Sequence, residues 1–205
     1  MNKKTFSLIE LIFVITLIAI ISSYSNYKNN QNRLILAKNQ IIMHLKYMRY
    51  IAMLDNKYEH DNDLWFRKAW NMKFLNCQKK IGGIYYVVYS NTINSGHWAI
   101  SKEETLKDPL NNNHIYSNQC KKDELYDKSK FVLLSEYYGI KDIKISCNYT
   151  GSLGQILFLN DGGAYSKFDE NINEYKIINN CTISLIGDNN EQEDIIIEAN
   201  TGYIY

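Results

Sequence analysis

The sequence lacks the signatures of an enzyme and of a metal site. It contains neither a G-x-S-x-G elbow nor a P-loop, and its histidines do not form the H-E-x-x-H spacing of a zinc protease. The histidines are His44, His60, His97 and His114. Asp169, Asn171 and Asn173 begin like a calcium loop, but Glu174 replaces the required glycine. We therefore predict no enzymatic activity, no cofactor and no bound metal.

Proline and glycine are scarce, and neither sign of charge dominates. One proline, Pro109, and ten glycines occur in 205 residues, so no proline-rich or glycine-rich linker divides the chain. The formal net charge is +1, which argues against direct nucleic-acid binding. The length accommodates one modest globular domain besides the apolar N-terminus.

The four cysteines are widely spaced and include no C-x-x-C pair, which argues against redox catalysis and a zinc site. In an exported domain an even number of cysteines favours disulfides. Cys147 and Cys181 both lie in apolar, strand-like segments, so we favour Cys147–Cys181 together with Cys77–Cys120 among the three connectivities. Free buried thiols that act as small hydrophobic side chains are the alternative.

A long apolar run follows the basic start Met-Asn-Lys-Lys-Thr. Residues 6–21 read Phe-Ser-Leu-Ile-Glu-Leu-Ile-Phe-Val-Ile-Thr-Leu-Ile-Ala-Ile-Ile, with Glu10 alone among apolar neighbours. An ionised carboxylate in the centre of a bilayer costs about 2.5–3.5 kcal/mol even on a mild scale. Glu10 therefore needs a positive partner, and a cut between Thr5 and Phe6 would create one as the α-amino group of Phe6.

This N-terminus resembles the prepilin motif of type IV pilins and type II secretion pseudopilins. The resemblance implies cleavage before Phe6 by prepilin peptidase, methylation of the new amine, and a role for Glu10 in neutralising a neighbouring subunit's amine during assembly. Thr5 departs from the family, which usually has glycine or alanine at that position.

Membership of this family implies a non-enzymatic structural subunit. Its partners would be other pilin or pseudopilin subunits, prepilin peptidase, the inner-membrane assembly platform and the lipid bilayer. Its place would be the bacterial inner membrane as a single-pass protein, with the C-terminal domain in the periplasm, and the pilus or pseudopilus after assembly. Such an apparatus serves protein secretion, DNA uptake in competence, or motility.

Two other interpretations of the N-terminus compete with the prepilin motif. A secretory signal peptide cut after Ser25 would leave an exported binding module or enzyme that begins at Asn26. A permanent anchor is the second interpretation, but residues 6–21 extend only about 24 Å as a helix, against a hydrocarbon core of about 30 Å.

Apolar residues continue at helical spacing beyond the N-terminal run. Leu34, Ala37, Ile41, Leu45, Met48 and Ala52 recur at three- and four-residue steps, which predicts one helix from about Ser7 to about Leu54. His44 lies near this stripe and is expected to be structural rather than a ligand. We divide the chain into a leader (1–5), a transmembrane or assembly half of the helix (6–25), an amphipathic half (26–57) and a β-rich periplasmic domain (58–205).

The remaining sequence predicts an α+β fold: a long N-terminal α-helix, with a membrane half and an amphipathic half, packed on an antiparallel β-sheet or small β-sandwich. Residues 58–80 predict a loop or short helix, and 102–130 allow no prediction. The expected strands are 84–89, 97–100, 131–135, 143–148, 155–159, 164–168, 182–186, 194–198 and 203–205.

Three further segments narrow the resemblance. Residues 45–52, 155–163 and 194–204 look like the helix end and two C-terminal hairpin segments of H-type minor pseudopilins and the similar FimT-like minor pilins. The closing Thr201-Gly202 followed by an apolar residue is the best of these matches. The resemblance implies a minor rather than a major subunit.

Overall fold

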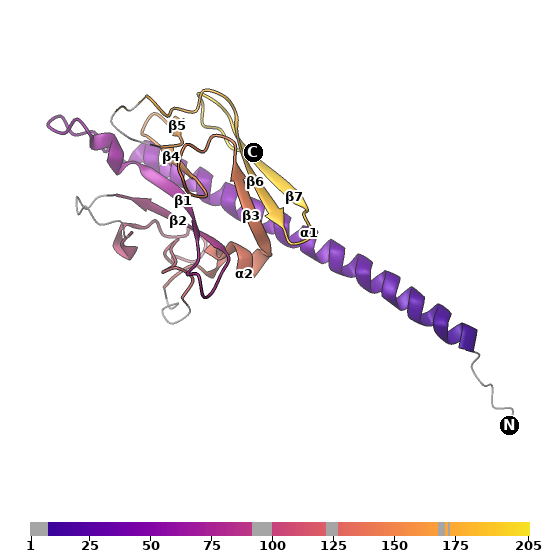
Figure 1. Ribbon diagram of the computed structural model, residues 1–205. Coiled ribbons are helices and arrows are strands. Elements are labelled where there is room, and N and C mark those ends of the chain that lie inside the picture. Colours follow the sequence, from indigo (N-terminus) through magenta and orange to yellow (C-terminus); the bar gives the residue numbers. More distant parts are fainter. Residues whose placement is uncertain (1–7, 92–99, 122–126, 168–170, 172) are drawn as a thin grey trace.

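The protein consists of a long helix that passes along an α+β domain and projects from it at its N-terminal end (Figure 1). The computed structural model describes residues 8–91, 100–121, 127–167, 171 and 173–205, without the side chains of 23–31. The helices are α1 (Leu8–Leu54) and α2 (Leu134–Tyr138), with short 3₁₀ helices at Trp65–Lys68, Lys102–Glu104 and Lys130–Val132. The strands are β1 (Trp70–Asn76), β2 (Ile84–Ser90), β3 (Ile140–Ile145), β4 (Gln155–Phe158), β5 (Ala164–Tyr165), β6 (Cys181–Gly187) and β7 (Gln192–Ile197).

The strands form two antiparallel sheets. One has the order β2-β1-β4-β5 and the other the order β3-β6-β7. Residues at the C-terminus extend the second sheet, because Ile204 pairs with Ile197 of β7. Helix α1 contacts strands of both sheets, so it serves as the element on which the two sheets meet.

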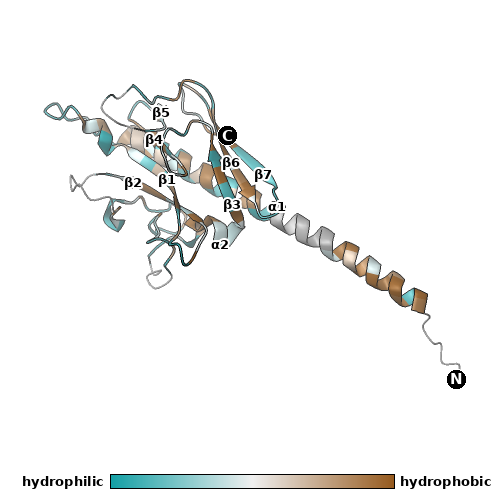
Figure 2. Ribbon diagram, in the orientation of Figure 1, coloured by the Kyte–Doolittle hydropathy of each residue, from teal (hydrophilic) through white to brown (hydrophobic). Residues whose placement is uncertain are grey.

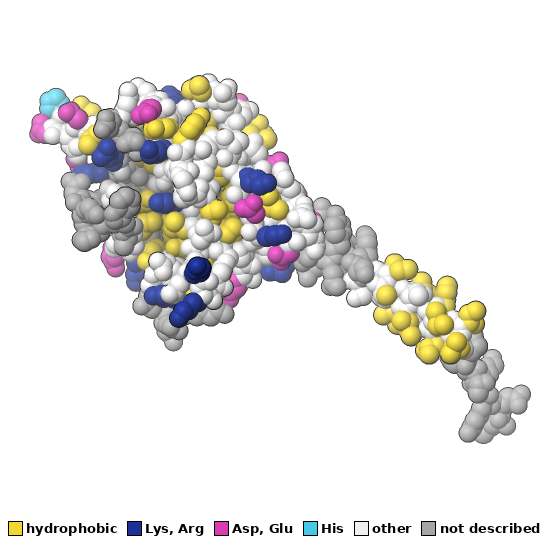
Figure 3. All heavy atoms as spheres, viewed as in Figure 1, with side chains coloured by type: hydrophobic (Ala, Val, Ile, Leu, Met, Phe, Trp, Pro, Cys, Tyr) yellow, Lys and Arg dark blue, Asp and Glu magenta, His cyan; other side chains and the backbone are white. Residues whose placement is uncertain are grey.

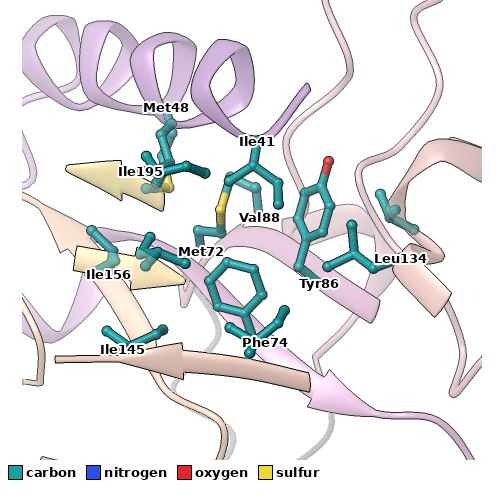
Figure 4. Close-up of a cluster of buried hydrophobic side chains, with 14 of the residues drawn as sticks. Ile41, Met48, Met72, Phe74, Tyr86, Val88, Leu134, Ile145, Ile156 and Ile195 are labelled. Carbon is teal, nitrogen blue, oxygen red and sulfur yellow. The ribbon is translucent and has the colours of Figure 1, made fainter. Parts of the chain in front are cut away.

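The apolar stripe of α1 supplies one side of the core. All six of its residues are at most 2% exposed, as their spacing predicts: Leu34, Ala37, Ile41, Leu45, Met48 and Ala52. Met72 and Phe74 of β1, Tyr86 of β2, and Ile195 of β7 close the core beneath the helix (Figure 4). Burial of each such large side chain contributes about 1.5–3 kcal/mol, so the stripe dominates the attachment of α1.

The predicted long apolar helix with a membrane half is wrong. The backbone of α1 is helical from Leu8 to Leu54, but its described side chains form a 15-residue apolar part and a 23-residue part that carries charges. Across the described residues, no helix has the length and apolarity needed to span a bilayer. The fold is mixed α/β with two antiparallel sheets.

The sequence patterns located five strands well and failed at two segments. Strands β2, β4, β6 and β7 lie within a few residues of their predicted ranges, and β3 begins three residues before its predicted start. Segment 131–135 is wrong as a strand, because it forms the end of a 3₁₀ helix and the start of α2. Such a short apolar run has no periodicity that separates helix from strand.

Strand β1 was missed because the face of the sheet opposite the core carries Asn71 and Lys73 as well as Leu75. Met72 and Phe74 point into the core, whereas Asn71 and Lys73 lie on the other face of the sheet. The segment therefore reads as irregular, although its apolar residues do alternate. The predicted strand 97–100 lies, except for Ile100, outside the described residues, and of 164–168 only Ala164–Tyr165 is a strand.

Candidate assembly surface

The N-terminal part of α1 exposes an unusual amount of apolar surface. Eleven large hydrophobic side chains between Leu8 and Ile21 are 42–78% exposed: Leu8, Ile9, Leu11, Ile12, Phe13, Val14, Ile15, Leu17, Ile18, Ile20 and Ile21. We call this segment, Leu8–Ile21, the arm. It is the apolar end of the projecting helix in Figure 2, and its side chains cover the helix in Figure 3. Contiguous exposed apolar surface of this kind marks an interaction site.

The arm is apolar on every side of the helix. Consecutive residues of a helix point in directions about 100° apart, and the five residues from Leu11 to Ile15 are all apolar and all exposed. A helix that is apolar all round is stable when it is surrounded, not when one side only is covered. The arm therefore fits an environment of several neighbouring helices or of lipid.

Glu10 lies in the first described turn of α1 and is exposed. Its side chain, with those of Ile9, Phe13 and Val14, lines a shallow depression on the arm. An ionised carboxylate costs about 2.5–3.5 kcal/mol in hydrocarbon, so Glu10 is the residue of the arm least suited to an apolar environment.

The expected cleavage site, Thr5 and Phe6, lies outside the described residues. Thr16, by contrast, donates its hydroxyl to the carbonyl of Phe13 at 2.8 Å. Because that hydrogen bond stays within the helix, Thr16 can enter an apolar environment without an external partner.

Polar contacts hold α1 against the domain from Arg33 onward, beyond the C-terminal end of the arm. Arg33 donates from Nη2 to the carbonyl of Tyr137 at 2.7 Å, and from Nε to the same oxygen at 3.1 Å, at the C-terminal end of α2. One and a half turns further along, Lys38 pairs with Glu193 of β7 at 3.0 Å. The direction of the arm is thereby fixed by the domain.

The three segments that carry the narrower resemblance converge at Arg49. Its Nε donates to the carbonyl of Gly162 at 3.1 Å, and its Nη2 donates to the carbonyl of Thr201 at 2.8 Å. Gly162 belongs to the turn after β4 and Thr201 to the turn after β7. One guanidinium thus joins the helix to both turns, and these matching segments form one structural clamp.

Glycine is required in this clamp because the two turns touch. Gly162 and Gly202 have φ values of 73° and 64°, in the left-handed region. A Cβ added to Gly202 would lie 2.4 Å from the carbonyl oxygen of Gly162 and 3.2 Å from Phe158 Cε1. The Thr201-Gly202 ending is therefore explained by backbone geometry and close packing.

A buried polar cluster joins α1 to the segment whose conformation could not be predicted. His44 Nδ1 is hydrogen-bonded to the Tyr86 hydroxyl at 2.7 Å, and His44 Nε2 lies 3.5 Å from Asp108 Oδ2 and 3.0 Å from Gln40 Nε2. The side chains of His44 and Asp108 are fully buried. His44 thus has a structural role, as expected. No group of three His, Cys, Asp or Glu side chains suited to a metal ion occurs among the described residues.

Asp108 is the residue of this cluster that sequence patterns missed. It accepts hydrogen bonds from the Leu110 N–H at 2.9 Å and from the Ser129 hydroxyl at 3.1 Å. Burial alone would raise the pKa of Asp108, but these hydrogen bonds and that of His44 hold it below its usual value of 3.8. Burial raises the pKa of Tyr86 well above 10.0, so the phenol remains protonated. The one available signal was an aspartate before Pro109, which is typical of a turn.

The predicted disulfide pairing is confirmed. Cys77 is bonded to Cys120, and Cys147 to Cys181, with Cα–Cα distances of 5.3 and 5.4 Å. No described cysteine is free. Asp169 of the calcium-like segment lies outside the described residues, and the Asn171 side chain accepts from the Asn173 N–H at 2.9 Å, as in a local turn.

Comparison with known proteins returned no relative. No family model, no curated protein and no solved structure matches the chain. Function is therefore inferred from the arm, from Glu10 and from the contacts that hold α1 against the domain.

Replacing Gly202 with alanine tests the clamp. We expect Gly202→Ala to lower the free energy of unfolding by about 2 kcal/mol or more, because the new Cβ forces the turns apart and the left-handed φ is strained. Urea denaturation measures the change. Gly151→Ala is the matched control, since a Cβ there would meet no atom within 4 Å. Equal stability of the two variants would contradict the close packing at Gly202.

Replacing Asp108 with asparagine tests the buried cluster. At pH 7 we expect Asp108→Asn to lower the free energy of unfolding by about 1–3 kcal/mol, because a hydrogen-bonded buried charge is lost. The folded-state pKa of Asp108 lies below the unfolded value, so its contribution is complete above pH ~4 and disappears as the pH falls through the folded pKa. The difference from the wild type should therefore narrow below pH ~4.

Urea titrations at pH 7 and pH 3 measure this difference. The exposed Asp194 offers a control, because Asp194→Asn should change stability by no more than about 0.5 kcal/mol. A gap between wild type and Asp108→Asn that stays constant down to pH 3 would show that ionised Asp108 does not stabilise the fold.

Proposed function

We propose that the chain is a minor pilin-like structural subunit of a type II secretion pseudopilus or a type IV pilus. The observation that carries this proposal is the arm, an apolar helix with one carboxylate, which projects from a disulfide-bonded domain that buries its own core. The domain completes its fold without covering the arm. The arm is therefore available to other subunits.

Self-association of arms accounts for their apolar surface. Each Leu, Ile or Phe side chain that moves from water into a helix–helix contact contributes about 1.5–3 kcal/mol before the cost of association is subtracted. Because the arm is apolar on all sides, it favours a bundle of several subunits over a simple dimer. A filament with arms at its centre provides such surroundings.

Glu10 supplies the axial register in this proposal. Once the arm is surrounded by apolar neighbours, an ionised carboxylate costs about 2.5–3.5 kcal/mol. The α-amino group of Phe6 on a neighbouring subunit, produced by prepilin peptidase and then methylated, would remove that cost in one register only. Registers that leave Glu10 away from the amine are disfavoured.

The same proposal assigns the partners and the location. The unassembled subunit resides at the bacterial inner membrane, where the arm contacts lipid and the domain faces the periplasm. Prepilin peptidase and the assembly platform act on it there, and the pilin or pseudopilin subunits receive it. The chain itself performs no catalysis.

The mature N-terminus distinguishes this proposal from its rival. We expect mass spectrometry of the protein from its native membrane to find a chain that begins at Phe6 with a methylated amine. An exported binding module or enzyme that uses the segment only as a signal would begin at Asn26. A mature chain that begins at Asn26 has lost the arm, and it would overturn the assembly proposal.

Replacing Glu10 with valine tests the register. Glu10→Val should leave the protein stable and retained with the membrane, because an acid is removed from an apolar helix. Its incorporation into sheared filaments should nevertheless fall by about tenfold or more, since about 1.4 kcal/mol corresponds to a factor of ten. Immunoblotting of sheared filaments against the cell fraction measures the ratio.

Thr16→Val is the matched control on the same arm. It also replaces a polar side chain with an apolar one, but the Thr16 hydroxyl is already bonded within the helix. We expect this variant to assemble at wild-type levels. Wild-type incorporation of Glu10→Val would show that Glu10 does not set the register.

A further inference from the structure

The two disulfides occupy different environments. Cys147–Cys181 cross-links the adjoining ends of β3 and β6. It lies next to the hydrogen bond from the Ser146 N–H to the carbonyl of Thr182. Cys77–Cys120 instead joins two loops, the β1–β2 turn and the turn at residues 117–120. It forms part of the wall of an open hollow of about 450 Å³. Reagents in solvent can enter this hollow.

The two cysteines of this disulfide are buried to different extents. Cys77 is half-buried and Cys120 is 2% exposed; Cys147 and Cys181 differ in the same way, so the hollow, and not exposure, distinguishes the two disulfides. Gly83 lines the hollow beside Cys77, and a Cβ added there would lie 3.8 Å from Cys77 Sγ. Ser135 lies closer still to that position, with its Cβ at 2.8 Å and its Oγ at 3.0 Å, so it fills the space beside Gly83. Access to the disulfide is given by the hollow, which both Cys77 and Cys120 line.

The backbone on both sides of this disulfide is in an uncommon conformation. Gly82 and Gly83 have φ values of 72° and 92°, and Gln119 and Cys120 have values of 52° and 64°. Left-handed conformations in non-glycine residues cost about 1–3 kcal/mol each and occur in clusters at switch regions. Here they are maintained by the cross-link and by hydrogen bonds, among them that from the Cys77 N–H to the Gly83 carbonyl at 2.8 Å and that from the Gln78 N–H to the Gln119 carbonyl at 3.1 Å.

Lysine residues flank this disulfide in the sequence, and Glu136 lines the hollow. Lys79 and Lys80 follow Cys77 at two and three residues, Lys121 follows Cys120 directly, and all three side chains are exposed. The residues next to Cys147 and Cys181 are Ser146, Asn148, Asn180 and Thr182, which are uncharged. Cationic neighbours attract an attacking thiolate and stabilise the thiolate that leaves.

We propose that Cys77–Cys120 is a thiol–disulfide exchange site, attacked at Cys77 Sγ by an external dithiol, while Cys147–Cys181 is a structural cross-link. The attacking thiolate forms a bond to Cys77 Sγ, the Cys77–Cys120 bond breaks, and Cys120 leaves as a thiolate that takes a proton from water. The second thiol of the reagent, as thiolate, then attacks its own sulfur in the mixed disulfide. Cys77 is released as a thiolate, and the oxidised product is the reagent's disulfide.

Opening this bond has a local consequence. Residues 117–120 would be held to the β1–β2 turn only by hydrogen bonds, whereas Asp108 and the β3–β6 cross-link would keep their contacts. Reduction of Cys77–Cys120 would therefore release one loop while the rest of the domain stays folded.

Timed reduction of the full-length oxidised protein tests the proposal. The protein in non-ionic detergent is treated with limiting dithiothreitol, quenched with acid, alkylated after denaturation and mapped by peptide mass spectrometry. We expect Cys77 and Cys120 to be labelled at least about tenfold faster than Cys147 and Cys181. Equal rates, or earlier labelling of Cys147 and Cys181, would overturn it.

Two further measurements identify which sulfur is attacked and whether the lysines affect the rate of opening. Reduced glutathione, as a monothiol, should be trapped on Cys77, and an adduct found mainly on Cys120 would contradict the proposed direction of attack. The double substitution Lys79→Gln with Lys80→Gln should slow opening several-fold at low salt. Lys141→Gln with Lys144→Gln, on exposed positions of β3, is the matched control and should leave the rate unchanged. If the disulfide opened at the same rate with and without Lys79 and Lys80, the proposed effect of positive charge would be contradicted.

Discussion

The domain depends on the covering of one apolar stripe on α1. Both sheets reach this stripe, so neither sheet has a complete core of its own, and the helix is the shared wall between them. Apolar burial is strong but non-directional. It fixes which face of α1 is inside, but it does not fix the position of the helix along its axis. That position is set by polar contacts at four points along the helix, made by Arg33, Lys38, His44 and Arg49.

These polar contacts also explain how distant parts of the sequence come together. Arg49 binds two turns that are separated by about forty residues of chain and would otherwise be connected only through the sheets. His44 meets Asp108, which organises residues 108–129 through its own hydrogen bonds. A buried carboxylate is costly without such donors, so Asp108 and its partners form a unit in which each member requires the others.

The sequence predicted features that depend on local periodicity, and it failed where distant residues decide. The stripe on α1 and strands such as β6 follow from the spacing of apolar residues alone. The pairing of Cys147 with Cys181 followed from two strand-like segments, which proved to be neighbours in a sheet. Strand β1 and helix α2 were not predictable in this way, because whether such a segment becomes a strand or a helix depends on the distant residues that pack against its faces. The membrane half of the helix was predicted from composition, and the described apolar part is too short.

The two parts of α1 satisfy different physical requirements. In the domain, the buried apolar side chains of the helix belong to one core cluster with side chains of both sheets, so folding accounts for them. In the arm, eleven large apolar side chains have no such cover within the described domain, so folding does not account for them. An apolar surface provides affinity without register, because one apolar contact replaces another at little cost. Among residues 8–22 only Glu10 carries a charge, so register can be specified by Glu10 and by no other charged side chain of that segment.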